Sequence, residues 1–543
     1  IAALVCGAWQ QADAQYVSKV WVSDQKDGTY INPIIHADYS DPDVCAVGDD
    51  FYMTASSFGC APGLPILHSK DLVNWRLANY ALKEIEPTIF FNAPQHGKGV
   101  WAPSIRYHNG EFFIYWGDPD WGIFMVKTKD PLGEWEKPVL VKAGKGMIDP
   151  TPLWDEDGKV YLVHAWAGSR AAFNSVITVC EMNAGGTKVI SEPVLVFDGN
   201  DGVNHTIEGP KFYKRNGYYY ILAPAGGVVT GWQLALRSRN VYGPYESKIV
   251  MAQGDTDING PHQGGWVETC TGESWFINFQ DKAMYGRVLH LNPVKWENDW
   301  PVIGEDKDGD GCGEPVKRYK KPDVGRIYPI ETPIESDEFN TRQLGLQWEW
   351  HANYQDTFGF TSDLGYIRIY GHILSKDFVN FWEVPNLLLQ KFPAEEFTAT
   401  AKLKVSAKAD GQQSGLIVMG WDYGYLGVVK EGDKFILNQV VCKDAEQRSP
   451  ETVTHLAELP VSRRFGAGLY PNYERDIYLQ VKVTGGGICY FSYSLDGRKY
   501  TLAGVPFTAR QGKWIGAKVG LFSTAPYGKE RGWVDADWFR IDK

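Results

Sequence analysis

The segment DPDVCAVGDDFYMTASS (41–57) decides the fold, because its pattern returns along the first three hundred residues of the chain. Three further clear copies are APSIRYHNGEFFIYW (102–116), DPTPLWDEDGKVYLVHA (149–165) and GPKFYKRNGYYYILAP (209–224). A weaker fifth copy, WVETCTGESWFINFQ (266–280), lacks the proline. Each copy has two runs rich in aromatic and β-branched residues around a tight turn such as Asn-Gly or Asp-Gly, which predicts a β-hairpin.

The spacing of the copies predicts the larger unit. Their starts lie about fifty to sixty residues apart, which leaves room for two further strands in each copy. Five four-stranded units in succession indicate a five-bladed β-propeller, which we place at residues 28–304. The alternative is a β-sandwich whose strands resemble one another by accident.

The chain changes character after the propeller. Residues 305–335 are rich in proline, glycine and charge, and we predict a linker there. From 336 to 543 alternating strands resume with a different spacing, as in FTATAKLKV (397–405) and DIYLQVKV (476–483). We therefore predict an all-β protein whose second domain is an antiparallel β-sandwich.

Composition narrows the functional class. The formal net charge of the 543 residues is −12 and no basic stripe appears, which argues against nucleic acid as a partner. No apolar run reaches the roughly 18 residues of a membrane-spanning helix. The 21 tryptophans suit a β-rich core, and they also suit stacking on the apolar faces of sugar rings.

The first residues predict export. The stretch IAALVCGAWQQADAQ (1–15) is an apolar run followed by the small-x-small sequence Ala12-Asp13-Ala14. We interpret residues 1–14 as the remainder of a signal peptide and expect a periplasmic or secreted protein. Cys6 leaves a cell-surface lipoprotein open, although Leu4-Val5 is not the small pair expected before a lipidated cysteine. The other cysteines are scattered without a CxxC pair, so they predict neither a zinc site nor a dense disulfide scaffold.

Acids recur at equivalent places in the copies. Asp41 opens the first copy, Asp149 opens the third, and Glu208 directly precedes the fourth. The innermost strand of each blade lines the propeller axis, so these three side chains are expected to converge. Aspartate before proline is also a common turn initiator, but the shared register favours a site. Glycoside hydrolysis needs one protonated and one ionised carboxyl group, and a further carboxylate can raise the pKa of the acid.

Five ordered motifs resemble glycoside hydrolase family 43. They are NPIIHADYSDPDV (32–44), VWAPSI (100–105), GMIDPTPLW (146–154), TIEGPKFYKRNGYYYILAP (206–224) and GPHQGGWVET (260–269). The second domain, with SDEFN (336–340) and NFWEVPNLLLQKF (380–392), resembles the concanavalin-A-like, jelly-roll sandwich of many family β-xylosidases and α-L-arabinofuranosidases. The resemblance implies that Asp41 is the general base, that Glu208 is the general acid and that Asp149 tunes the acid. It also implies inversion of configuration.

The resemblance also implies substrate-binding residues. Phe58, Trp101 and Arg287 match positions that contact the sugar in the family. Trp166 and Arg170, in HAWAGSRAAFN (164–174), are expected to contact a +1 sugar. Packing between blades is the alternative for the aromatic side chains.

Two places in the sequence suggest a cation. His262 matches a family histidine that faces an ion, typically calcium with a supporting role, or water in the axial channel. A buried histidine held by hydrogen bonds is the alternative, and no cofactor is expected for the chemistry. Asp306, Asp308 and Asp310 imitate the opening of a calcium loop, but Lys317 stands where the bidentate glutamate belongs, which favours a solvated linker.

The expected activity is exo-acting release of terminal α-L-arabinofuranosyl units from plant cell-wall hemicellulose or its oligosaccharides. The HADYSDPD form of the first motif (36–43) favours arabinose, with a β-xylosidase as the alternative. Invertases and levansucrases share the propeller but use Asn-Asp-Pro-Asn-Gly and Glu-Cys motifs, which this chain lacks. A non-catalytic glycan-binding propeller is the alternative of another class, although such a protein is expected to have lost an acid.

Four tryptophans of the second domain allow two interpretations. A carbohydrate-binding face is one, and packing of the domain on the propeller to help close the active site is the favoured other. The residues are Trp348, Trp350, Trp382 and Trp421.

Overall fold

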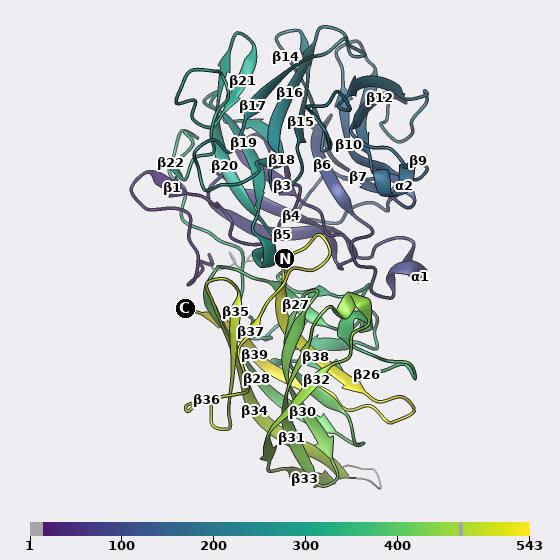
Figure 1. The fold of residues 1–543 in the computed structure, drawn as a ribbon, viewed down its shortest axis with the longest axis vertical. Helices are drawn as coiled ribbons and strands as arrows, with labels where there is room; N and C mark the ends of the chain where they lie inside the picture. The colour runs from purple at the N-terminus through teal and green to yellow at the C-terminus, as the bar shows by residue number, and fades with distance from the viewer. Residues whose placement is uncertain (1–14, 466–470) are drawn as a thin grey trace, which may run out of the picture.

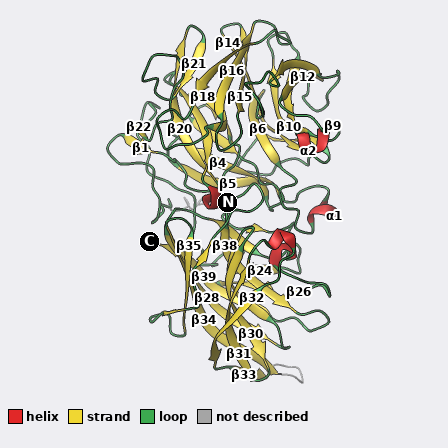
Figure 2. Cartoon of the chain, in the orientation of Figure 1, coloured by secondary structure: helices red, strands yellow, loops and turns green. Residues whose placement is uncertain are grey.

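The computed structural model describes residues 15–465 and 471–543, and it is almost entirely β-structure in two domains (Figures 1 and 2). The predicted fold class is confirmed: five four-stranded sheets form a propeller, and two larger sheets form a sandwich. Residues 1–14, interpreted above as the remainder of a signal peptide, and Cys6 within them lie outside the described residues. In the described part of the chain, no helix is long and apolar enough to cross a membrane.

Each blade is one continuous stretch of chain with its four strands in sequence order. The first strands of blades 5, 1, 2, 3 and 4 contact one another in that order around the axis, and the first strand of blade 5 contacts the second and third strands of blade 4. Blade 1 has β2 (Asp43–Val47), β3 (Asp50–Thr54), β4 (Gly63–Ser69) and β5 (Trp75–Leu82); blade 2 has β6 (Trp101–His108), β7 (Glu111–Asp118), β8 (Gly122–Thr128) and β9 (Val139–Ala143); blade 3 has β10 (Met147–Trp154), β11 (Val160–Trp166), β12 (Val176–Met182) and β13 (Val194–Asp198); blade 4 has β14 (Lys211–Arg215), β15 (Tyr218–Ala225), β16 (Trp232–Ser238) and β17 (Glu246–Met251); blade 5 has β18 (His262–Glu268), β19 (Ser274–Asp281), β20 (Arg287–Glu297) and β21 (Trp300–Ile303).

The predicted hairpins join the first two strands of the blades. In blade 2, His108 pairs with Glu111 across the two-residue turn Asn109-Gly110. Both turn residues have positive φ, 49° and 84°, as the right-handed strand twist requires of such a turn. Asparagine and glycine tolerate this conformation, which is why the Asn-Gly pair marks the turn in the sequence.

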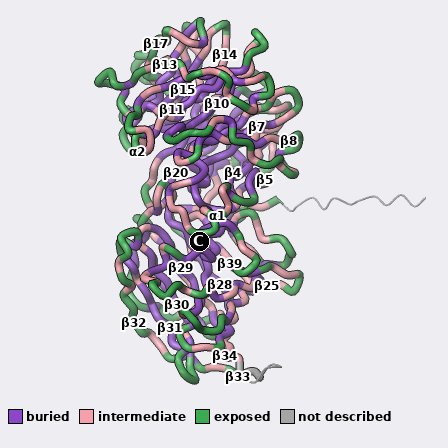
Figure 3. Tube along the Cα trace, turned by 90° about the vertical axis from the view of Figure 1, so that its right-hand side faces the viewer, coloured by how far each residue is buried: buried purple, intermediate pink, exposed green. Residues whose placement is uncertain are grey.

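Alternating side chains join each blade to its two neighbours. On β7, Ile114 packs in the apolar cluster shared with blade 1, whereas Phe113 and Tyr115 pack in the cluster shared with blade 3. Successive residues of a strand point to opposite faces, so a blade between two others must be apolar on both. This explains the continuous apolar runs of the copies and the buried interior of the ring in Figure 3.

The predicted linker contains a strand. β22 (Arg318–Lys320) pairs antiparallel with β1 (Thr29–Ile31), which precedes blade 1. Asn32 follows β1 and donates from Nδ2 to the carbonyls of Leu291 and Val316, each at 2.8 Å. The segments before and after the propeller therefore lie side by side on blade 5.

The second domain is a sandwich of two mainly antiparallel sheets that enclose one apolar core. One sheet holds β23 (Glu349–Trp350), β26 (His372–Ile373), β27 (Leu388–Lys391), β29 (Gln413–Met419), β30 (Tyr423–Glu431), β31 (Lys434–Cys442), β32 (Thr452–Leu459) and β38 (Lys518–Ala525). The other holds β24 (Gly359–Ser362), β25 (Tyr366–Tyr370), β28 (Phe397–Ala407), β33 (Ser462–Phe465), β34 (Pro471–Thr484), β35 (Ile488–Ser494), β36 (Thr501–Leu502), β37 (Phe507–Thr508) and β39 (Trp533–Asp542). The helices found in residues 15–465 and 471–543 are single turns: α1 (Thr88–Phe91), α2 (Gly168–Ala171), η1 (Ala283–Tyr285), η2 (Phe381–Glu383) and η3 (Ala445–Gln447).

The tryptophans of the sandwich lie mainly in packed positions. Trp348 and Trp350 are buried in the sandwich core. The ring of Trp382 stacks on His96 of the propeller with the centroids 3.5 Å apart. The guanidinium of Arg510, an arginine of the same domain, lies over the ring of Trp421. These contacts favour the packing interpretation over a flat carbohydrate-binding face.

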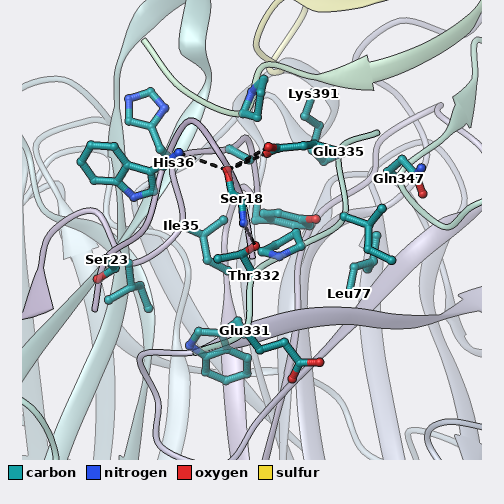
Figure 4. Close-up of a pocket in the computed structure, with 18 of the residues that line it drawn as sticks. Ser18, Ser23, Ile35, His36, Leu77, Glu331, Thr332, Glu335, Gln347 and Lys391 are labelled. Carbon is teal, nitrogen blue, oxygen red and sulfur yellow. Dashed lines mark hydrogen bonds between the residues drawn. The ribbon is translucent and has the colours of Figure 1, made fainter. Parts of the chain in front are cut away.

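A cavity of about 60 Å³ lies where the two domains, the linker and the segment before the propeller meet (Figure 4). Ser18 Oγ donates to both carboxylate oxygens of Glu335 at 2.9 Å, and burial raises the pKa of Glu335 to about 7. The three acids predicted to be catalytic are not among the residues that line it. The cavity therefore belongs to the domain junction.

Candidate active site

The acids stand where the inner strands begin. Asp41 and Asp149 both adopt positive φ, 56° and 58°, which is uncommon for residues other than glycine. In blade 3 the register shifts between Ile148 and Thr151, and in blade 5 between His262 and Gly264. Such irregularities redirect side chains at a strand end and are often found beside functional sites.

Asp41 is held by three donors. Its Oδ2 accepts hydrogen bonds from Ser40 Oγ at 2.7 Å and from Ser56 Oγ at 2.6 Å. Nη1 of Arg287 lies 3.1 Å from Oδ1 of Asp41 and also donates to Ser40 Oγ at 2.7 Å. The side chain of Asp41 is buried, so the guanidinium compensates a charge that is costly without a partner.

Gly209, the residue after Glu208, links Glu208 to Asp149 through a hydrogen bond. The backbone N–H of Gly209 donates to Oδ2 of Asp149 at 2.7 Å, which ties the start of blade 4 to blade 3. Gly209 has a φ of 60°, and a Cβ there would lie 2.5 Å from Cγ of Gln263. Only glycine fits this position, so the Glu-Gly pair places the Glu208 carboxylate beside Asp149.

Electrostatics separate the roles of the acids. The low-dielectric surroundings raise the pKa of Glu208 to about 8, and the charges of Asp149 and Asp41 add to the rise. Although 32% of the Glu208 side chain is exposed, protein surrounds it closely enough for this penalty to dominate. Burial also raises the pKa of Asp149. The three carboxyl groups therefore do not all ionise at neutral pH, and the larger rise, that of Glu208 to about 8 against about 7 for Asp149, favours the proton on Glu208.

His262 is buried beside Glu208. Its Nε2 lies 3.6 Å from Oε1 of Glu208, and neither ring nitrogen has a hydrogen-bond partner among the described residues. Burial and the positive charge of Arg287 lower the pKa of His262 to about 3, so the imidazole is neutral. Unpartnered buried nitrogens fit water in the channel.

No group of three acidic, cysteine or histidine donors forms at His262 in the described part of the chain, and calcium there stays a prediction. Calcium prefers six to eight oxygen ligands, and within the described part of the chain three acidic, cysteine or histidine donors come within 4.8 Å of one another only at Asp306, Asp308 and Asp310. That cluster lies in the predicted linker, where Asp306 already accepts the backbone N–H groups of Gly309 and Gly311.

Aromatic side chains from both domains surround the Asp41–Arg287 pair. The rings of Phe58 and Trp101 lie 6.4 Å apart, and Trp101 lies 6.2 Å from Trp514 of the sandwich. The Arg287 guanidinium carbon is 5.8 Å from the Trp514 ring centroid. Trp514 remains 44% exposed, so part of its ring surface is free for a ligand.

Of the two residues expected at a +1 sugar, only Arg170 reaches this group. Its guanidinium lies 5.6 Å from the Trp101 ring and is oriented by Asp120, whose Oδ1 accepts from Nε at 3.1 Å. Trp166, among the described residues, makes its ring contacts with His164 and Phe173 and not with the other predicted site residues.

Sequence reasoning missed three members of the site. Trp514 belongs to a loop of the other domain, so no propeller repeat points to it. Ser56 lies near the end of the first copy, where serine carries no distinctive signal. Lys211 follows Gly209-Pro210 in the fourth copy; it is fully buried, its Nζ donates to the carbonyl of Pro103 at 3.1 Å, and burial lowers its pKa. It follows the Gly-Pro pair at the position where the first and third copies have Asp43 and Thr151, and a lysine there was the available signal.

A five-bladed propeller whose axis carries a carboxyl group of raised pKa and another paired with an arginine has the features of the propeller glycoside hydrolases. The family model of Glycosyl hydrolases family 43 matches residues 30–301, and that of the beta xylosidase C-terminal concanavalin A-like domain matches residues 336–542. The chain belongs to glycosyl hydrolases family 43, and its substrate is a carbohydrate.

Similar proteins cover both domains. A beta-xylosidase from Formosa agariphila is 33% identical over 568 residues, which cover 96% of this chain and 91% of that protein. A non-reducing end alpha-L-arabinofuranosidase from Bacteroides ovatus is 31% identical over 444 residues, covering 77% and 79%. The crystal structure of the GH43 BlXynB protein from Bacillus licheniformis has a TM-score of 0.77 at 26% identity, covering 95% of this chain and 99% of that one.

Proposed function

We propose that this enzyme removes single terminal pentose units with inversion, Asp41 activating water, Glu208 protonating the leaving oxygen and Asp149 tuning Glu208. The observation that carries the proposal is the contrast between two carboxyl groups. Glu208 has a pKa of about 8, whereas Asp41 is paired with Arg287. An acid and a base that coexist at neutral pH are what inverting hydrolysis requires.

The chemistry follows from the groups that surround each acid. Asp41 accepts a proton from a water whose oxygen bonds to the anomeric carbon on the face opposite the leaving group, while the Arg287 guanidinium and two serine hydroxyls keep the carboxylate oriented; Asp41 later releases this proton to solvent. Glu208 gives its proton to the glycosidic oxygen as the bond to the anomeric carbon breaks. The charge left on Glu208 is unfavourable beside Asp149 and Asp41, so the next proton is taken up readily from solvent.

Xylose is the sugar we place first. The beta-xylosidase relative matches over more of this chain and at slightly higher identity than the arabinofuranosidase relative. The HADYSDPD motif favoured arabinose, so an α-L-arabinofuranosidase is the second candidate. Terminal α-L-arabinofuranose and β-D-xylose present similar arrangements of hydroxyl groups, so one site that takes both is consistent with the proposal.

Export to the periplasm or cell surface and a plant cell-wall substrate belong to the same proposal. Aromatic rings around the acids suit a sugar ring, and terminal pentoses occur on plant hemicelluloses. The support for export is the apolar stretch at residues 1–14.

Initial rates on aryl β-D-xyloside, aryl α-L-arabinofuranoside and pentose-bearing oligosaccharides test the assignment. We expect the xyloside to be preferred and the first-formed free sugar, followed by proton NMR, to have the inverted anomeric configuration. Asp41→Asn is expected to lose turnover on all substrates. Release of no pentose from any substrate contradicts the activity, and a first-formed sugar of retained configuration contradicts the roles of the two acids.

A further inference from the structure

Asp38 joins the two domains beside the site. Its side chain is 5% exposed, and each carboxylate oxygen accepts a backbone N–H from a different domain. Oδ1 accepts from Arg287 at 2.8 Å, and Oδ2 accepts from Gly516 of the sandwich at 2.9 Å. Arg287 binds Asp41, and Gly516 lies two residues after Trp514. One carboxylate therefore connects the backbone segments that carry two side chains of the site.

The backbones of the two segments are in direct contact. A Cβ on Gly516 would lie 2.8 Å from the backbone nitrogen of Gly286, and a Cβ on Gly286 would lie 2.5 Å from Cβ of Asp38. The backbone N–H of Ala517 donates to the carbonyl of Met284 at 2.8 Å. Glycine at both positions lets the chains approach closely enough for Asp38 to reach both N–H groups.

The sandwich loop is also fixed on its other side. A Cβ on Gly97 of the propeller would lie 2.3 Å from Cγ of Lys513, so these two segments touch as well. Trp514 itself has a φ of 64°, a conformation that a tryptophan keeps only where its surroundings impose it. The sandwich loop is thus held against the propeller on two sides, and the indole of Trp514 contacts Trp101 and Arg287.

The charge of Asp38 is compensated from several sides. Burial raises its pKa, while Lys391, Lys518 and the two backbone donors oppose this effect. A buried carboxylate with one donor from each domain favours a single docked arrangement, because separation of the domains leaves it partly unpaired.

We propose that Asp38 is a positioning residue that locks the sandwich loop onto the propeller and thereby sets Arg287 and Trp514 relative to the catalytic acids. The inference rests on the proposed function, because its main readout is turnover. It assigns no chemical step to Asp38. The buried carboxylate of Asp38 thereby makes a loop of the sandwich domain part of the site.

Two substitutions disturb the contact from opposite sides. Asp38→Asn keeps the size, but an amide has one oxygen to accept and an NH₂ group that faces the remaining N–H donor. Gly516→Ala leaves the carboxylate intact and pushes the loop away from Gly286. We expect each variant to lower kcat/KM for an aryl pentoside by about tenfold, and we expect a Trp514→Ala background to reduce the cost of Asp38→Asn to less than about threefold.

The control is a carboxylate that makes similar contacts inside the sandwich alone. Asp337 accepts from the backbone N–H of Phe339 at 2.8 Å and from Nε1 of Trp348 at 2.9 Å. Asp337→Asn is expected to lower the melting temperature while leaving kcat/KM within about twofold, as expected for independent sites. A general loss of stability would affect both variants alike.

Hydrogen exchange of the backbone amides at 515–517 gives a readout apart from activity. We expect faster exchange there in Asp38→Asn and no change in Asp337→Asn. The proposal is overturned if Asp38→Asn leaves both exchange and kcat/KM unchanged, or if it costs the same with and without Trp514. Should the wild type release no pentose while exchange still rises in Asp38→Asn, the proposed function fails and the positional role of Asp38 stands.

Discussion

Replacement of Glu208 by glutamine should remove the alkaline limb of the pH profile. Glutamine has nearly the same size but cannot donate a proton to the leaving oxygen. In the native enzyme the surrounding protein and the charges of Asp149 and Asp41 raise the pKa of Glu208 to about 8. Because the acid is active only when protonated, kcat/KM should fall as the pH rises through this value.

The size of the effect follows from that pKa. A pKa of about 8 leaves roughly nine tenths of Glu208 protonated at pH 7 and roughly one tenth at pH 9, so kcat/KM should drop about tenfold over that interval. Glu208→Gln should reduce turnover of a pentose oligosaccharide by about 10²- to 10⁴-fold at pH 7. A nitrophenyl glycoside should lose much less, because nitrophenolate leaves with little protonation.

The assay compares wild type and variant on both substrates between pH 5 and pH 10. Glu335→Gln is the matched control, because burial raises the pKa of Glu335 to about 7 in a cavity away from the acids. The control should keep the wild-type profile. The reasoning is refuted if Glu208→Gln retains the alkaline limb, or if both substrates lose the same factor.

Three further outcomes are expected. Asp149→Asn removes a like charge beside Glu208, so the pKa of Glu208 falls and the alkaline limb of kcat/KM moves to lower pH; a limb that stays in place contradicts the coupling. Asp41→Asn should lower kcat by about 10³-fold or more on aryl and natural glycosides alike, since water activation does not depend on the leaving group, and unequal losses would argue against a base. Glu349→Gln removes the carboxylate that pairs with Lys391 and Lys518: the native pKa of about 2 against 4.5 corresponds to about 3 kcal/mol of stability, present above pH 4.5 and lost as the pH falls through 2. Denaturant unfolding at pH 7 and pH 3 measures that difference, and a loss under about 1 kcal/mol at pH 7 contradicts it.

The repeat made the propeller predictable. Each hairpin has its own turn residues, and a copy needs only its neighbours to bury its two faces, so local sequence carries most of the information. The shared register of Asp41, Asp149 and Glu208 followed from the same repeat. The strand β22 in the predicted linker was missed, because three residues rich in charge carry no strand signal without their partner β1.

Contacts between the domains were not predictable from the pattern. Trp514 and Gly516 lie in a loop of the sandwich, and their place at the site depends on how two folded domains dock. Trp166 illustrates another difficulty: it ends a blade strand, and its ring packs with neighbours of its own blade, so its predicted contact with a +1 sugar stays a prediction. An aromatic residue near a strand end fits packing as well as binding, so residue type alone does not separate them.

The ring of blades closes without an exchanged strand, and the junction between blade 5 and blade 1 is where Arg287 meets Asp41. Backbone hydrogen bonds between Leu289 and the pair Ile34-Ile35 reinforce the same junction. On the proposed roles, catalysis depends on ring closure, because separation of blades 5 and 1 would part Asp41 from Arg287.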